Sequence, residues 1–253
     1  MMIENLALVA PLFFLAALLF ASVGHGGASA YLAIMALLSV APESMRPAAL
    51  MLNVLVATIA LYKFTRVNAF DWQLFWPLAV MSVPFAFLGG LVKLPAQTYK
   101  PLVGLVLIVA ATQLFLKAKY SSQINIAPVQ RLTLFGLGAG LGLLSGLTGV
   151  GGGIFLSPIM VLKNWAQTKV ISGVSAAFIL ANSLAGLLGV LTKNPALPTN
   201  LVYWAIAVVL GGWLGAEYGS KKLANMQIRQ LLALVLLFAG GKMLWEGLTL
   251  LLK

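Results

Sequence analysis

The chain has 253 residues, of which 61% are hydrophobic and 8% are charged. A soluble domain of this length carries about 25% charged residues, so a water-soluble fold is excluded and the bilayer must solvate most of the surface. The net charge of +11 comes from basic residues scattered between apolar runs, an arrangement that suits lipid headgroups and disfavours nucleic-acid binding. With no cysteine and one histidine, we expect no disulfide, no metal site and no cofactor.

Ten apolar segments follow one another along the chain. Eight are long enough to cross a membrane as helices, which takes about 17–25 residues. These eight are 6–23, 45–62, 73–92, 99–116, 132–148, 170–191, 199–216 and 230–252. Two shorter segments, 28–40 and 154–162, follow the first and the fifth long segments. The pattern predicts an all-α, polytopic membrane protein with eight long helices and two short half-helices.

The first long segment is expected to stay in the protein. Residues 28–30 (ASA) resemble a signal-peptide cleavage site. Residues 1–5, however, contain Glu4 and no Lys or Arg, whereas a signal peptide begins with a basic region.

A glycine cluster precedes each short segment. The first glycine segment is 24–27 (GHGG) and the second glycine segment is 149–153 (GVGGG). Glycine costs a helix about 1 kcal/mol relative to alanine, so each cluster predicts a break, which must be buried in protein or line a watery cavity. The new helix after each break begins with unpaired N–H groups and the positive end of its dipole. Such a start is suited to binding an anion.

The two halves of the chain resemble each other. The first glycine segment matches the second at an offset of 125 positions, and Asn53 in MLNVLVA matches Asn182 in ILANSLA at an offset of 129. One insertion of four residues reconciles the two offsets. We therefore predict an internal two-fold repeat in which glycine cluster and Asn recur in the same order.

The repeat also predicts the domain boundaries. Residues 102–110 (LVGLVLIVA) match 231–239 (LLALVLLFA), and a polar stretch lies between the halves. We expect a first transmembrane repeat at 1–120, a linker at 121–130 and a second transmembrane repeat at 131–253.

The basic residues favour one of two topologies. If each glycine segment reverses the chain, the Lys and Arg residues divide ten to six between the two sides of the membrane, as the positive-inside rule expects. If each segment only kinks one crossing helix, they divide eight to eight. The first arrangement is favoured, and it makes the halves inverted copies, as in many secondary transporters.

The candidate substrate-binding residues are the glycine segments, nearby hydroxyl groups and the two asparagines. They are Gly24, His25, Gly26, Gly27, Ser29, Asn53, Thr148, Gly149, Gly151, Gly152, Gly153 and Asn182. His25 is the only imidazole, so it is also a candidate carrier of a coupling proton. Alternative roles are close helix packing for the glycines and interhelical hydrogen bonds for the asparagines and the histidine.

Three stretches resemble the TauE/SafE family of sulfite-exporter-like membrane permeases. They are GHGGASAYLAIMAL near the start, SGLTGVGGGIFLSPIMVL after the midpoint and the following VSAAFILANSLAGLLG. The resemblance covers the whole chain. It implies transport of anions such as sulfite, sulfonates or small organic acids, driven by an ion or proton gradient. It also implies that the two glycine motifs and the Asn pair form the substrate region.

The sequence therefore predicts a multi-pass secondary transporter of a small organic or sulfur-containing anion in a bacterial-type plasma (inner) membrane. The expected partners are the anion, membrane lipid, a coupling proton or cation, and a second copy of the chain. The alternative is an anion channel of similar architecture. An assembly subunit is a weaker alternative, and an intramembrane enzyme is disfavoured because HExxH is absent and one His allows at most a Ser–His pair.

Overall fold

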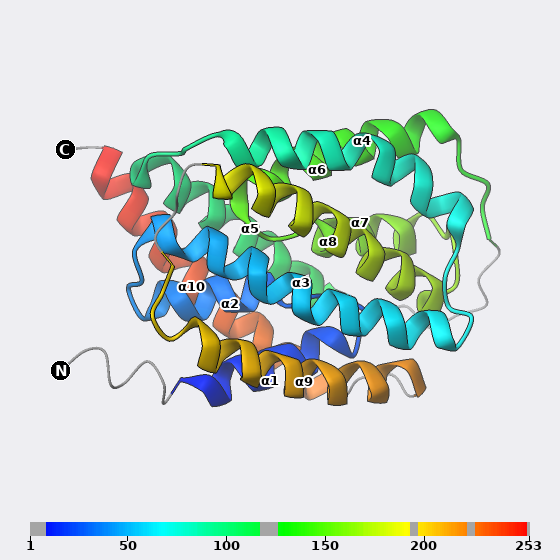
Figure 1. Ribbon diagram of the computed structural model, residues 1–253, viewed down its shortest axis with the longest axis horizontal. Helices are drawn as coiled ribbons and strands as arrows, with labels where there is room; N and C mark the ends of the chain where they lie inside the picture. Colours follow the sequence, from blue (N-terminus) through cyan, green and yellow to red (C-terminus); the bar gives the residue numbers. More distant parts are fainter. Residues whose placement is uncertain (1–8, 117–125, 193–196, 222–225, 252–253) are drawn as a thin grey trace.

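The computed structural model describes residues 9–116, 126–192, 197–221 and 226–251, which form ten helices and no strand. The helices are α1 (Ala10–Ala21), α2 (Ala28–Leu37), α3 (Pro42–Arg66), α4 (Trp72–Leu91), α5 (Ala96–Leu116), α6 (Arg131–Thr148), α7 (Gly153–Leu162), α8 (Thr168–Leu191), α9 (Leu201–Lys221) and α10 (Met226–Leu251). The helices α3, α4, α8 and α9 run roughly along the long axis of the molecule, whereas α10 lies obliquely to it (Figure 1). The predicted all-α class is confirmed.

Five of the described helices are long and apolar enough to cross a bilayer, namely α3, α4, α6, α8 and α9. The helices α1, α2 and α7 and the apolar part of α5 are shorter. A polytopic membrane protein is therefore supported. The count of eight long helices stays a prediction, as does the division into two repeats.

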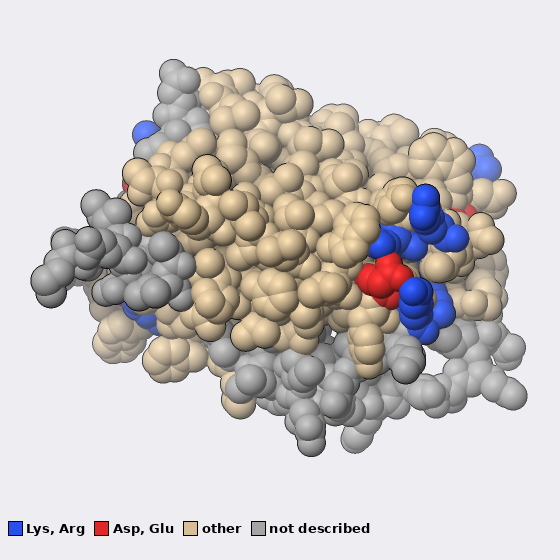
Figure 2. All heavy atoms as spheres, turned by 60° about the horizontal axis from the view of Figure 1, so that its bottom comes forward, with Lys and Arg blue, Asp and Glu red and all other residues tan. Residues whose placement is uncertain are grey.

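The outer surface is apolar along the helices. Large side chains such as Leu132 and Phe238 are exposed to 79% and 72%. Figure 2 shows a face whose middle carries no charged side chain, with the visible charges lying towards its ends. A patch of this extent would drive association in water, whereas in a bilayer it is the surface that contacts the acyl chains.

A glycine stripe joins α9 to α1. Gly211 and Gly215 of α9 face the backbone of Phe14 and Leu18 in α1, and a Cβ on either glycine would overlap with it. Because both residue numbers rise together, the two helices are parallel. Small residues at every fourth position allow this close approach of two backbones.

The same arrangement joins α6 to α4. Gly138 and Gly146 of α6 face the backbone of Leu78 and Ala86 in α4. These two helices are again parallel, and their backbones again touch where side chains are missing. Two tightly packed pairs, α1–α9 and α4–α6, thus connect the first half of the chain to the second.

The chain reverses direction at both glycine segments (Figure 1). Phe13, near the start of α1, stacks on Tyr31 of α2 with ring centroids 5.6 Å apart. Ser22, at the end of α1, instead lies beside Gly219 near the end of α9. The short helix α2 therefore runs back alongside α1, and α7 runs back after α6 in the same way. Each glycine segment is a hairpin rather than a kink.

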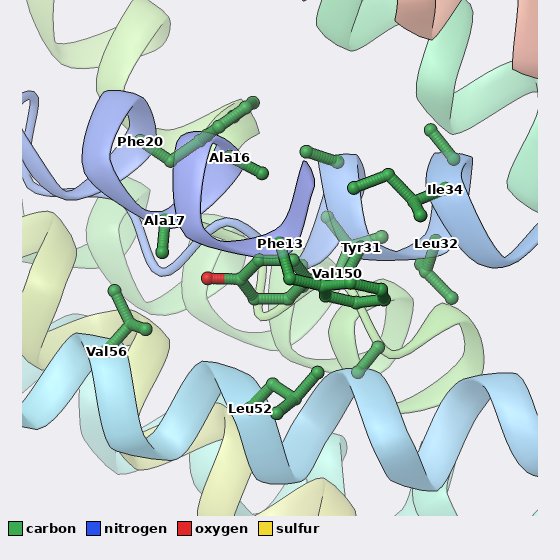
Figure 3. Close-up of a cluster of buried hydrophobic side chains, with 14 of the residues drawn as sticks. Phe13, Ala16, Ala17, Phe20, Tyr31, Leu32, Ile34, Leu52, Val56 and Val150 are labelled. Atoms are coloured by element: carbon green, nitrogen blue, oxygen red, sulfur yellow. The ribbon is translucent and has the colours of Figure 1, made fainter. Parts of the chain in front are cut away.

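The largest apolar cluster encloses α2, whose residues from Ala28 to Ala36 are all buried. The ring of Phe13 lies between those of Tyr31 and Trp204, and its centroid is 4.6 Å from that of Trp204. Leu52 and Val150 close the cluster from α3 and from the second glycine segment (Figure 3). The start of this short helix is thus fixed by packing in the middle of the protein.

Candidate functional site

The predicted helix breaks are present at both glycine segments. Five glycines there adopt positive φ angles between 75° and 95°, in the left-handed region that other residues rarely occupy. They are Gly24, Gly27, Gly149, Gly151 and Gly152. The N-cap residues of α2 and α7 are both glycines, so neither helix start is capped by the side chain of its own N-cap residue.

Asn53 of α3 connects the two breaks. Its side chain is fully buried, and Oδ1 accepts a hydrogen bond from the backbone N–H of Ala28, the first residue of α2, at 3.2 Å. Its Nδ2 donates to Oγ of Ser183 in α8 at 3.0 Å and to the carbonyl of Val150 at 3.4 Å. One amide therefore joins a helix start in the first half to the glycine segment and long helix of the second half.

The starts of α2 and α7 meet at Asn53 and Ile179. A Cβ on Gly26 would overlap with Oδ1 of Asn53, and a Cβ on Gly151 would overlap with Nδ2. Both Cβ positions also lie near Ile179, at 3.1 Å and 3.0 Å, and a Cβ on Gly153 would overlap with Ile179. The absence of side chains is thus what allows the two segments to approach this centre, which we call the central junction.

His25 begins a second polar connection between the halves. Its Nε2 lies 3.2 Å from Oγ of Ser157 in α7, and that hydroxyl lies 2.7 Å from Oγ of Ser175 in α8. Its Nδ1 faces the carbonyl of Val23 at 3.1 Å. With the proton on Nδ1, the ring donates to Val23 and accepts from Ser157 at Nε2. All three polar side chains are buried.

Three residues of α8 that the sequence did not single out face the central junction. They are Ser175, Ile179 and Ser183, spaced four apart, so they lie on one face of the helix. The signal that would have found them is this spacing, combined with the position of Ser157 one turn into α7. The sequence alone does not show which face of α8 points inward.

The other candidate residues of the first half support the break. A Cβ on Gly24 would overlap with the backbone of Ser172 in α8. The hydroxyl of Tyr31 donates to the carbonyl of Gly26 at 2.8 Å and would lie 2.6 Å from a Cβ on Gly27. Ser29 is buried in the first turn of α2.

The remaining candidates of the second half also hold the backbone in place. The hydroxyl of Thr148 donates to the carbonyl of Leu144 at 2.7 Å and accepts from the N–H of Val150 at 3.4 Å. A Cβ on Gly149 would lie 3.2 Å from Arg46, and one on Gly152 would lie 2.9 Å from Phe178. These glycines are packing positions around the junction.

Asn182 does not take part in the bridge that Asn53 makes. It is fully buried, and neither its Nδ2 nor its Oδ1 has a hydrogen-bond partner within the described residues. The side chain of α8 that lies near Gly26, Gly151 and Gly153 together is that of Ile179. The two asparagines matched in the sequence therefore have different surroundings.

Arg46 places a positive charge beside the second glycine segment. It is 7% exposed, and its guanidinium donates to the carbonyls of Val92 and Gly89 at the end of α4, at 2.8 Å and 2.5 Å. A cation at this place stabilises the negative end of the helix dipole. Its backbone and Cγ contact Gly149, so the residue also fixes the outer edge of the break.

A bundle with a lipid-facing apolar surface and two interrupted helices that start at a buried polar junction is the architecture of a membrane transporter. The comparison with known families agrees with this class. The chain belongs to the sulfite exporter TauE/SafE family, whose model matches residues 9–243.

Named relatives extend this result. "Probable membrane transporter protein y4hK" of Sinorhizobium fredii is 39% identical over 236 residues, which cover 92% of this chain and 96% of the relative. "Probable membrane transporter protein YunE" of Bacillus subtilis is 26% identical, with 77% of each chain covered. "Probable membrane transporter protein MJ0441" of Methanocaldococcus jannaschii is 24% identical, with 74% and 73% covered. No solved structure matches the chain at a comparable level.

Proposed function

We propose that the protein is a secondary transporter of a small organic or sulfur-containing anion in the plasma membrane, and that the anion binds at the central junction. The observation that carries the proposal is the hydrogen bond from the first N–H of α2 to Oδ1 of Asn53. A neutral amide oxygen occupies the place where an anionic oxygen would be bound more strongly.

The central junction offers several hydrogen-bond donors, which can offset the free-energy cost of removing an anion from water. Each helix start contributes about 0.3–2 kcal/mol through its dipole, which is far less than the cost of removing an anion from water. Hydrogen bonds to a charged acceptor add about 1.5–3 kcal/mol each. The amide of Asn53 and the hydroxyls of Ser157, Ser175 and Ser183 can supply such bonds, together with the backbone N–H groups of α2 and α7.

Transport through this junction requires movement of the helices. Asn53 is fully buried and His25 is 4% exposed, so an anion cannot reach them while the helices keep this packing. An inverted repeat would supply two alternative openings. The pairing of α1 with α9 and of α6 with α4 supports such a repeat, since each pair joins the first helix of one half to the fourth helix of the other.

A coupling proton is part of the same proposal. His25 lies in the first glycine segment and contacts Ser157 at the start of the opposite short helix. Protonation turns Nε2 from an acceptor into a donor, which would add a positive charge and a hydrogen bond beside the anion. Loss of the proton would weaken binding and favour release.

The test is flux into liposomes that contain the purified protein. A panel of sulfite, thiosulfate, sulfoacetate and short carboxylates is offered, and uptake is measured against concentration with and without unlabelled anion inside. The carrier account predicts saturation and faster exchange when the same anion is present on both sides. Linear flux without exchange would instead establish the alternative, an anion channel. No flux of any anion in the panel would contradict both.

A further inference from the structure

Three polar side chains outside the central junction are buried without a partner. The hydroxyls of Ser82 in α4 and Ser145 in α6 and the amide of Asn182 in α8 have no hydrogen bond within the described residues. All three residues are 0% exposed. An unpaired buried polar group costs stability that Ala or Leu would not cost, so three on three neighbouring helices call for a ligand. We call them the α4–α6–α8 polar trio.

The trio lies at one level of the bundle. A Cβ on Gly142 would overlap with the backbone of Ser82, and Ser145 is the next residue but two along α6. One helical turn further on, a Cβ on Gly186 of α8 would lie 3.4 Å from Cα of Gly146 in α6 and 3.6 Å from the carbonyl oxygen of Ala86 in α4. Ser82 precedes Ala86 by four residues, and Asn182 precedes Gly186 by four residues, which is about one helical turn in each case. The two side chains therefore lie about one turn before this contact on their helices.

We propose that the α4–α6–α8 polar trio binds a monovalent cation of the size of Na⁺. It offers two hydroxyl oxygens and one amide oxygen, all of them buried and without a hydrogen bond within the described residues. Neutral oxygens of this kind can replace the hydration shell of a monovalent ion.

The charge of the surroundings selects against a divalent ion. The helix α4 contains no charged residue between Trp72 and Leu91. Within the described part of the chain, no group of three or more His, Cys, Asp or Glu side chains lies together. Sites for Ca²⁺ and Mg²⁺ usually include at least one carboxylate, so a set of neutral oxygens favours an ion of single charge.

The cation site adjoins the central junction. A Cβ on Gly152 would lie 3.5 Å from Cβ of Ser145, and Asn182 precedes Ser183, which accepts the hydrogen bond from Asn53. Occupancy by a cation would therefore fix α6 and α8 where they touch the second glycine segment. A role for this ion in driving transport rests on the proposed anion transporter, whereas binding of the ion does not.

The experiment is thermal unfolding of the purified protein in detergent, in NaCl, KCl and choline chloride at equal ionic strength. A ligand that binds only the folded state raises the melting temperature in a saturable way. We expect such a rise with NaCl relative to choline chloride. It should be lost in Ser145→Ala and Asn182→Leu. It should be kept in Ser220→Ala, because Ser220 is a buried serine of α9 whose hydroxyl already donates to the backbone carbonyl of Glu217.

Equal melting temperatures of the wild type in the three salts would overturn the proposal, because the trio would then hold water alone. An unchanged sodium effect in both Ser145→Ala and Asn182→Leu would overturn it as well. The result is independent of anion flux. A sodium effect on the melting temperature without any flux would support the cation site and contradict the anion transporter. Flux in sodium-free buffer, together with equal melting temperatures in the three salts, would support the transporter and contradict the cation site.

Discussion

The two glycine segments share a backbone plan and differ in chemistry. Both break a helix with left-handed glycines and lead into a short helix of ten residues. The first carries His25, which forms polar contacts with α7, whereas the second carries Val150, which packs into the apolar cluster around α2. Each glycine segment leads to a helix start, and of the two segments only the first carries a titratable side chain.

The long helices after the two breaks differ in the same way. Where α3 presents Asn53 to the central junction, α8 presents Ile179, flanked by Ser175 and Ser183. One half therefore contributes the amide and the imidazole, and the other contributes hydroxyls. Two similar helix starts thus meet different side chains at the central junction. Three substitutions at the junction test this division of roles, and a fourth at the end of the bundle is compared with them, taken from the largest expected effect to the smallest.

The largest effect is expected for Gly151→Val. Its φ of +83° is unfavourable for a β-branched residue, and its Cβ would overlap with Nδ2 of Asn53. Backbone strain of about 1–3 kcal/mol adds to this displacement, and we expect transport to fall by more than about tenfold, since 1.4 kcal/mol is a factor of ten. Liposome flux normalised to inserted protein is the measurement.

The comparison with the first segment sharpens that result. Gly26→Val meets Oδ1 of Asn53 but carries no positive φ, so its loss should be smaller than that of Gly151→Val. Gly136→Ala is the matched control because nothing lies within 4 Å of its Cβ position. Normal flux in Gly151→Val would remove the second glycine segment from the site.

The next effect is that of Asn53→Leu. It leaves the N–H of Ala28 and the hydroxyl of Ser183 without the partner they have now, which costs about 1–3 kcal/mol for each unsatisfied buried group. We expect lower thermal stability and a large loss of flux. Ile179→Val, at the facing position, should cost only about 0.5–1.5 kcal/mol and keep transport. Equal losses in the two variants would contradict the asymmetry.

A smaller effect is expected for His25→Gln, which keeps a polar side chain but does not titrate. Flux through the wild type should change over the pH range in which an imidazole gains its proton, and flux through the variant should not. Ser157→Ala removes the hydroxyl that faces Nε2 and should alter the profile without abolishing it. A variant profile that follows the wild type would exclude His25 as the proton carrier.

The smallest effect belongs to the ion pairs at the end of the bundle. Lys63 of α3 meets Glu217 of α9 at 2.5 Å, and Glu217 also pairs with Lys221. The Glu217 side chain is 37% exposed, and exposed pairs contribute about 0–1 kcal/mol. Glu217→Gln should therefore shift the melting temperature slightly and leave flux unchanged. A strong loss of flux would show that this pair closes the transport path.

Much of the fold can be predicted from the sequence because its signals are local. The apolar segments are long, and contiguous glycines break a helix wherever they occur, so the sequence indicates both hairpins together with Asn53. The helix register cannot be predicted in this way. The helices α3 and α8 begin at Pro42 and Thr168, a shift of 126 positions, which pairs Asn53 with Ile179 rather than with Asn182.

The hydroxyl contacts cannot be predicted from the sequence for a related reason. The contact between Ser157 and Ser175 depends on how α7 packs across α8, and it joins residues whose neighbours are all apolar or small. The sequence position of Arg46 suggests a charge near the membrane surface, yet its guanidinium is buried against the end of α4. The Ser157–Ser175 contact and the burial of Arg46 both depend on tertiary contacts, which the sequence pattern does not indicate.

Equilibrium binding of the transported anion to the wild type and to Asn53→Asp, at one pH in sodium-containing detergent buffer, tests the central claim most directly. The introduced carboxylate has the shape of the amide but carries its own negative charge next to the first N–H of α2. We therefore predict saturable binding by the wild type and at least about tenfold weaker binding by a folded Asn53→Asp, equivalent to 1.4 kcal/mol. Equal affinity in the two proteins would contradict an anion site at the starts of α2 and α7.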